Sequence, residues 1–145
     1  MKFMIIISLF FLGACAPLGP QFEKLAEPEK DSALIYYYRP GRIIGGAVRY
    51  DVHENGKRIT TLYNGGYTLH KSHAGNKHID ATTETTSVLD FTAENNKRYF
   101  VRGQVGMGIL IGRPKLTLVD EKEAIEEIKD CRFILEDDEN IISGE

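Results

Sequence analysis

Two glycine-rich segments combine arginine with large aliphatic side chains, and they carry the clearest binding chemistry in the sequence. They are RPGRIIGG, residues 39–46, and GQVGMGILIGRP, residues 103–114. A guanidinium presents five donors in a planar fork that suits carboxylate or phosphate groups. Exposed aliphatic patches mark sites of partner or membrane contact. If the two segments meet at one end of the fold, they form an apolar binding patch with arginines on or near its rim, made of Arg39, Arg42, Ile43, Ile44, Ile109, Leu110, Ile111 and Arg113.

The same residues also allow a purely structural role. They would then cover the open end of the core, and the arginines would form structural salt bridges. A nucleotide phosphate loop is excluded, because Gly103, Gly106 and Gly108 are not followed by Lys-Ser or Lys-Thr and do not stand between a strand and a helix.

Residue types able to catalyse hydrolysis or to bind metal are present, but their spacing does not match those functions. The sequence has no Gly-x-Ser-x-Gly motif. His70, His73 and His78 flank one predicted turn, whereas structural zinc sites usually have four ligands at well-defined spacing. We therefore expect no enzyme activity, no cofactor and no metal, and an enzyme or a metal-binding protein is the least favoured function.

The N-terminus has the pattern of a secretory signal. Lys2 precedes an apolar run of ten residues from Phe3 to Leu12. A helix of that length rises ~15 Å, half of a ~30 Å hydrocarbon core, so the run is too short to span a membrane. The stretch that ends it, LGAC at residues 12–15, resembles the bacterial lipoprotein box.

That resemblance implies that residues 1–14 are a lipoprotein signal peptide and that Cys15 is lipidated. In the lipoprotein family the thiol of this cysteine receives a diacylglyceryl group, and a peptidase then cuts before it. Stable anchoring needs more than one acyl chain, which a diacylated cysteine supplies. Ala16, where aspartate is absent, resembles the outer-membrane sorting pattern of enteric bacteria. We therefore expect attachment through Cys15 to the cell envelope, at the outer membrane and facing the periplasm; an ordinary signal peptide with an incidental cysteine is the alternative.

Composition divides the rest of the chain into a tether, one domain and a tail. Prolines and glycine among polar residues predict a flexible, lipidated tether over 15–31, and strand and helix patterns predict a β-sandwich domain with a C-terminal helix over 32–135. Residues 136–145 form an acidic tail that we expect to be disordered. Residues 31–119 have twelve Lys/Arg against seven Asp/Glu, and residues 120–145 have three against eleven. A basic body allows binding to anionic glycan or lipid, whereas the alternative is that the acidic end only keeps the protein soluble.

Eight short strands at roughly ten-residue spacing predict a mainly β fold, an antiparallel sandwich. Tyr36, Tyr37 and Tyr38 belong to a strand that is apolar on both faces, as in the centre of a sheet, and we expect all three in the core. Asn55-Gly56 is a strong hairpin signal, and Asn95-Asn96 predicts another hairpin. The expected strands cover residues 33–39, 47–53, 57–63, 67–71, 77–83, 87–91, 97–103 and 114–119.

One helix is predicted after the last of these strands. Asp120 can cap it, and Glu123 completes the capping-box pattern. Ala124, Ile125, Ile128 and Cys131 fall on one helical face, which predicts packing against a sheet. We therefore expect Cys131, the thiol that remains after lipidation, to be buried; the alternative is a free thiol that pairs between chains.

The order of these elements resembles a bacterial lipoprotein family known as domain of unknown function 2846. The resemblance rests on YYYRPGRIIGGAVRYDVHENGKRI and on YFVRGQVGMGILIGRPKLTLVDEKEA, and the hairpin region is also similar to PEGA-type β-sandwich modules. It implies a lipid-anchored, sandwich-like envelope domain and brings no substrate or catalytic residue. We expect a non-catalytic module that binds or scaffolds another envelope component, with an envelope protein as its partner; the alternative is a glycan- or anionic-lipid-binding module. No feature of the sequence suggests a nucleic-acid partner.

Overall fold

The computed structural model describes residues 17–135, which contain ten strands and one helix. The predicted signal peptide 1–14, the predicted lipidation site Cys15 and the predicted tail 136–145 lie outside the described residues. Within the described part, the helix is too short and too polar to cross a membrane. The elements are β1 (Leu18–Gln21), β2 (Ala33–Tyr38), β3 (Tyr50–Glu54), β4 (Lys57–Leu62), β5 (Gly66–Ser72), β6 (Gly75–Thr82), β7 (Thr86–Ala93), β8 (Arg98–Gly106), β9 (Arg113–Val119), α1 (Glu121–Ile128) and β10 (Arg132–Ile134).

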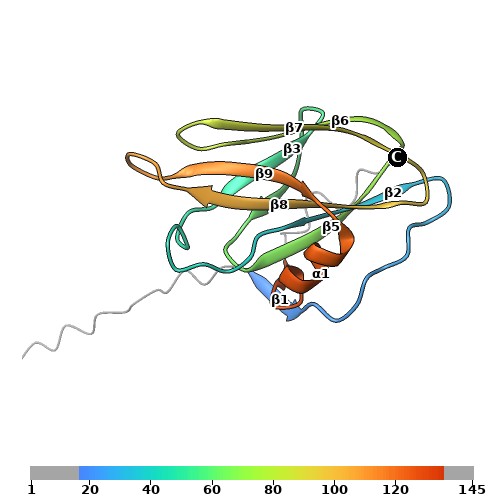
Figure 1. Cartoon of the computed structure of the whole chain (residues 1–145), viewed down its shortest axis with the longest axis horizontal. Helices are drawn as coiled ribbons and strands as arrows, with labels where there is room; N and C mark the ends of the chain where they lie inside the picture. Colours follow the sequence, from blue (N-terminus) through green and yellow to red (C-terminus); the bar gives the residue numbers. More distant parts are fainter. Residues whose placement is uncertain (1–16, 136–145) are drawn as a thin grey trace, which may run out of the picture.

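The strands form two sheets that pack face to face, and α1 covers the outer side of the larger sheet (Figure 1). The six-stranded sheet has the order β1-β10-β5-β2-β8-β9, and the four-stranded sheet has the order β4-β3-β6-β7. One core lies between the sheets and includes Val52 and Ile79. A second core lies under the helix and includes Phe100 and Ile128. The predicted mainly β sandwich with a C-terminal helix is confirmed, and β2–β9 correspond to the eight predicted strands.

β2 is the central strand on which both cores are built. Tyr36 and Tyr38 belong to the core under α1, whereas Tyr37 belongs to the core between the sheets. Each of the three tyrosines is at most 1% exposed. Successive side chains of a strand point to opposite faces, so a strand with a layer on either side must be apolar on both. The prediction that all three are core residues is confirmed, as is the burial of Cys131.

The connections between strands differ in part from the predicted ones. The Asn55-Gly56 hairpin between β3 and β4 is confirmed, with both turn residues at positive φ. The hairpin at Asn95-Asn96 is wrong, because β7 lies in the four-stranded sheet and β8 in the six-stranded sheet. β8 is buried on both faces, at Phe100 and at the following Val101, so it needs a layer on each side and pairs with β2. That pairing and the β5–β10 pairing are parallel, and the other six are antiparallel.

The structure corrects the predicted tether, because residues 18–31 pack on the domain. β1 is the edge strand of the larger sheet and pairs antiparallel with β10. The Phe22 ring meets the Tyr67 ring edge to face, with 5.5 Å between centroids. Leu25 also packs against the core under α1. The spacing of Phe22 and Leu25 matches neither a strand nor a helix pattern, so the sequence did not predict their packing. Both nevertheless pack against the core under α1.

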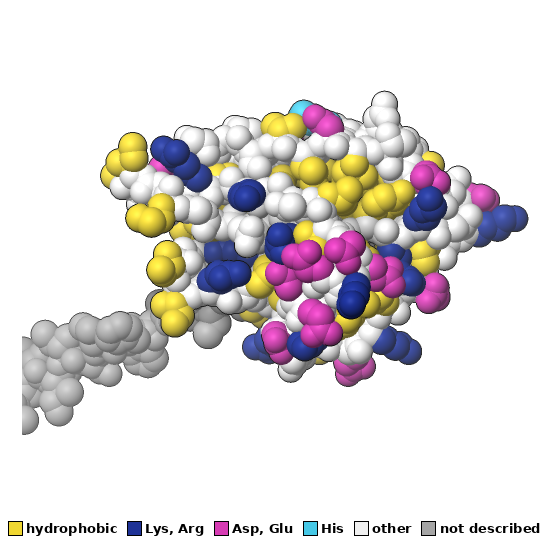
Figure 2. All heavy atoms as spheres, in the orientation of Figure 1, with side chains coloured by type: hydrophobic (Ala, Val, Ile, Leu, Met, Phe, Trp, Pro, Cys, Tyr) yellow, Lys and Arg dark blue, Asp and Glu magenta, His cyan; other side chains and the backbone are white. Residues whose placement is uncertain are grey.

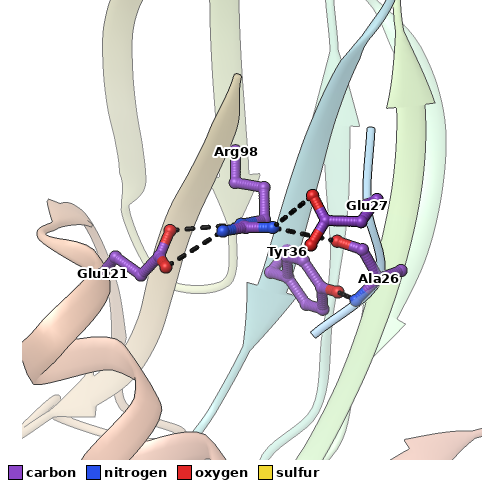
Figure 3. A network of polar contacts seen from close by, with 5 residues as sticks. All are labelled: Ala26, Glu27, Tyr36, Arg98 and Glu121. Atoms are coloured by element: carbon purple, nitrogen blue, oxygen red, sulfur yellow. Dashed lines mark hydrogen bonds and ion pairs between the residues drawn. The ribbon is translucent and has the colours of Figure 1, made fainter. Parts of the chain in front are cut away.

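Arg98 fixes the next part of this segment (Figure 3). Its guanidinium donates two hydrogen bonds of 3.1 Å to Glu121 of α1, one of 3.2 Å to Glu27 and one of 3.3 Å to the backbone oxygen of Ala26. The backbone N–H of Ala26 donates to the Tyr36 hydroxyl oxygen at 2.7 Å. This segment, α1, β8 and β2 are thus joined by hydrogen bonds and an ion pair.

Candidate functional site

The two glycine-rich segments meet at one end of the sandwich, which we call the loop end. It comprises the β2–β3 loop, residues 39–49, and residues 103–115, which hold the end of β8, the β8–β9 loop and the start of β9. A Cβ placed on Gly45 would lie 3.1 Å from Cγ1 of Val105, and a Cβ on Gly112 would lie 3.9 Å from Cγ2 of Val48. The two segments are therefore in van der Waals contact, as the predicted site requires.

The aliphatic side chains at the tips of both loops point into solvent. Their exposed fractions run from 59% at Ile111 to 100% at Ile43. Figure 2 shows separate apolar tips at the left of the molecule, with basic side chains next to them on the side of the domain. Side chains that closed the open end of the core would be buried, so a purely structural role does not account for these residues. We call this set the aliphatic tips: Ile43, Ile44, Met107, Ile109, Leu110 and Ile111.

The predicted arginines occupy two different environments. Arg42 and Arg113 are exposed, as expected for rim residues. Arg39 is only 2% exposed, and its guanidinium donates to the backbone oxygens of Gly45, at 2.6 Å, and of Val48. Burial lowers the pKa of Arg39, but an arginine titrates so far above neutrality that the charge persists. Arg39 thus holds the β2–β3 loop from within, and of the positions predicted for it, on or near the rim of the patch, its burial leaves only the one near the rim.

A carboxylate that the sequence analysis did not single out holds the second loop. Glu84, in the β6–β7 turn, accepts hydrogen bonds from four successive backbone N–H groups: Ile109 at 2.8 Å, Gly112 at 3.3 Å, and Leu110 and Ile111. These bonds lower the pKa of Glu84 to about 2. With the backbone polar groups turned inward to Glu84, the aliphatic side chains of the loop are turned outward. No local sequence signal marks such a long-range partner.

Replacing Glu84 with Gln should loosen the β8–β9 loop without unfolding the domain. A carboxamide has one acceptor oxygen and two donors, so it cannot receive four N–H groups. We expect severalfold faster amide hydrogen exchange at residues 109–112. In the wild type, the depressed pKa means that loop ordering is complete above the ordinary value near 4.5 and is lost as the pH falls towards 2.

The matched control is Glu94→Gln, which removes an exposed carboxylate that pairs with Lys97 far from this loop. It should leave the exchange of residues 109–112 unchanged. Equal protection of these amides in the Glu84→Gln variant and the wild type would show that Glu84 does not order the loop.

A cavity of about 300 Å³ opens between the two loops. Apolar lining comes from Ile44 and Val105, and cationic lining comes from Arg39, Arg42 and Lys115. Lys115, at the start of β9, was not among the predicted residues, although its spacing from Arg113 places both on the same face of a strand.

The positive charge of the loop end is not neutralised within the described residues. No carboxylate lies within ion-pair distance of its five basic side chains, and Glu84 is engaged by backbone N–H groups. Acidic side chains gather instead over α1, as Figure 2 shows. The loop end is thus both apolar and basic; its basic residues are Arg39, Arg42, Arg49, Arg113 and Lys115.

A second polar cluster lies buried between the sheets at their other end. Glu54 accepts from the Tyr37 hydroxyl at 2.8 Å and from the Ser72 hydroxyl, and Lys77 lies 3.1 Å away. The nearest imidazole, His70, is 3.8 Å from Glu54. Glu54 belongs to β3, whereas Tyr37 and Ser72 belong to β2 and β5 of the opposite sheet, so this buried cluster links the two sheets. Within residues 17–135, no three His, Cys, Asp or Glu side chains are grouped so as to hold a metal.

Comparison with known proteins identifies a family whose matched region includes most of the loop end. Residues 29–113, more than half of the chain, match the family described as "Protein of unknown function (DUF2846)". The chain is also 29% identical over 127 residues to an uncharacterized protein of Haemophilus influenzae, an alignment that covers 82% of this chain and 75% of that protein. No solved structure matches. The matched region contains the first loop entirely and the second up to Arg113, and the chain belongs to the DUF2846 family.

Proposed function

We propose that this protein is a non-catalytic binding module, held in the bacterial cell envelope by a lipid on Cys15, that contacts another envelope component through the loop end. The observation that carries the proposal is the fixed exposure of the aliphatic tips. Arg39 and Glu84 hold the two loops from within, so the apolar side chains stay in water at a standing free-energy cost. Exposed apolar patches of this kind mark interaction sites, because a bound ligand removes the apolar side chains from water.

The anchoring part of the proposal rests on the lipobox-like residues 12–15 and on the apolar run before them. An outer-membrane location facing the periplasm follows from Ala16 by analogy with enteric lipoproteins. The absence of catalysis is proposed because the described polar clusters are enclosed or engaged in structural bonds. An envelope protein or another envelope constituent would then cover the loop end.

The test is photo-crosslinking in living cells from a diazirine amino acid placed at Ile44 or at Ile111. Because the two residues lie on different loops of one surface, both should capture the same species. The matched control is the same probe at Lys57, which is exposed beside the Asn55-Gly56 turn at the opposite end of the sheets. A discrete adduct from both loop positions and none from Lys57 supports the proposal, whereas identical products from all three positions, or none, would refute it.

Anchoring is tested in the same strains with Cys15→Ser. We expect the wild type in the membrane fraction, labelled by an alkyne fatty acid supplied to the cells, and no label on the variant. Fatty-acid labelling that survives the substitution would exclude Cys15 as the anchor.

A further inference from the structure

We propose that the envelope component bound by the loop end is the anionic phospholipid bilayer itself, with the aliphatic tips among the acyl chains and lipid phosphates against the cavity. This inference names the ligand of the surface in the proposed function and rests on that function. Four features of the structure favour the bilayer over a protein or a glycan.

The first feature is the position of β1, the first strand of the described residues. Leu18 starts β1, and its Cδ2 atom would lie 3.2 Å from a Cβ on Gly66. Gly66 follows the Asn64-Gly65 turn, and Asn64 exchanges hydrogen bonds of 2.8 and 2.9 Å with the backbone of Arg42. The chain therefore enters the domain beside the β2–β3 loop.

The second feature is the short connection to the proposed anchor. Three residue steps separate Cys15 from Leu18, so an anchor at Cys15 would hold the start of β1 within about 11 Å of the lipidated residue. A domain with a long flexible tether could turn any face to the membrane. Here residues 18–31 pack on the domain, so an anchor at Cys15 would hold the start of β1, and the loop end beside it, close to the bilayer surface.

The third feature is the form of the apolar surface. The tips are two narrow loops, with Ile43 fully exposed and Ile109 and Leu110 more than four-fifths exposed. A protein partner needs a broad complementary surface, whereas narrow fixed loops can each enter a lipid layer. The bonds to Arg39 and Glu84 satisfy the backbone polar groups that they engage, as insertion into a water-poor layer requires.

The fourth feature is the charge around the tips. Arg42 and Lys115 line the cavity, and within residues 17–135 the Arg42 guanidinium and the Lys115 ammonium have no hydrogen-bond or ion-pair partner. Arg113 adds a further exposed cation beside the second loop. Guanidinium and ammonium groups at this level suit phosphates of the headgroup layer, and anionic lipid attracts basic segments next to the bilayer.

The experiment uses the full lipidated protein in vesicles of phosphatidylethanolamine and phosphatidylglycerol. An environment-sensitive fluorophore is attached through Ile44→Cys or Ile111→Cys, and lipids carrying a nitroxide serve as quenchers. Cys131 is buried and its thiol has a pKa raised to about 12, so it should escape labelling; wild-type protein verifies this. We expect blue-shifted emission and strong quenching at both loop positions, and neither at Lys57→Cys.

A charge variant separates anchoring from docking. Arg42→Gln with Lys115→Gln should shift the docked equilibrium by about fivefold for each charge removed, while the protein stays anchored. Vesicles of phosphatidylcholine alone should likewise show weaker quenching than anionic vesicles.

The inference and the proposed function fail in different ways. Fluorophores at both loops that stay as water-exposed as the one at Lys57 in anionic vesicles would overturn the bilayer inference. If cellular crosslinking from Ile44 and Ile111 still captured a discrete protein, the proposed function would stand with a protein ligand. If crosslinking also failed, both would fall.

Discussion

Replacing Glu54 with Gln is expected to lower the free energy of unfolding by about 3–5 kcal/mol, the range for breaking a buried ion pair on one side. Glu54 is 7% exposed and Lys77 is 6% exposed, and 3.1 Å separates the carboxylate oxygen from the ammonium nitrogen. Burial lowers the pKa of His70, so Lys77 supplies the charge that balances Glu54 at neutral pH. The carboxamide leaves that ammonium buried without a counter-charge.

The position of Glu54 between the sheets adds to this effect. The carboxylate on β3 accepts from Tyr37 of β2 and from Ser72 of β5, which belong to the opposite sheet. A glutamine oxygen cannot accept from both and also face Lys77, so the variant weakens the contact between the layers as well as the ion pair. Chemical denaturation followed by circular dichroism measures the loss.

Two controls isolate the ion pair. Lys77→Met added to Glu54→Gln removes the unbalanced charge, so the double variant should be more stable than Glu54→Gln alone. Glu94→Gln, which breaks an exposed pair with Lys97, should cost less than about 1 kcal/mol. Equal losses for Glu54→Gln and Glu94→Gln would contradict a structural role for the buried pair.

The same pair predicts a specific response to acid. Burial raises the pKa of Glu54, but hydrogen bonds from Ser72, Tyr37 and Lys77 and the proximity of His70 outweigh it and place the pKa below its ordinary value near 4.5. The unfolded state therefore binds a proton more readily than the folded state. This contribution to stability is complete above pH 4.5 and is lost as the pH falls below it, so Glu54→Gln should flatten the acid side of the stability profile.

The strand pattern was readable because each of β2–β9 contributes at least one apolar side chain to a core. β1 and β10 were missed for the opposite reason. Leu18–Gln21 contains a glycine and a proline, and it is a strand only because Arg132–Ile134, more than a hundred residues later, lies beside it. The proline is tolerated because β1 is the edge of its sheet. No local pattern carries that information.

The loop end likewise has features that the sequence indicates and features that only the structure reveals. Glycines and isoleucines outside any strand pattern indicated two exposed loops, and packing of β2, β3, β8 and β9 brings them together. Glu84 could not be found, since it acts on backbone groups that any residue would provide. The sequence does contain a signal for the inward orientation of Arg39. Alternation along β2 turns Tyr37 towards the facing sheet, and two residues later it turns Arg39 the same way.

That inward orientation makes Arg39→Met the second substitution with a large expected effect. Arg39 joins two backbone oxygens of the β2–β3 loop, those of Gly45 and Val48, and its guanidinium lies 5.7 Å from the centroid of the Tyr50 ring. Methionine fills part of the space but donates nothing, so two carbonyls lose their partner. We expect a loss of about 2–4 kcal/mol in the free energy of unfolding, from the cost of leaving buried polar groups unpaired.

Arg39→Lys retains the charge and should rescue little, because an ammonium on a flexible stem does not reproduce the planar fork that reaches both oxygens. Arg42→Met is the matched control: Arg42 is exposed and bonds to Asn64 through its backbone alone, so its substitution should change stability by less than about 0.5 kcal/mol. Arg39 and Arg42 would thus have different roles, although both belong to the β2–β3 loop. Loss of Arg39 should unfold or loosen the loop and only thereby remove crosslinking from Ile44, whereas loss of Arg42 should weaken lipid contact in a fully stable protein. If instead Arg39→Met were as stable as the wild type, Arg39 would have to be counted among the ligand contacts and the β2–β3 loop would need another source of order.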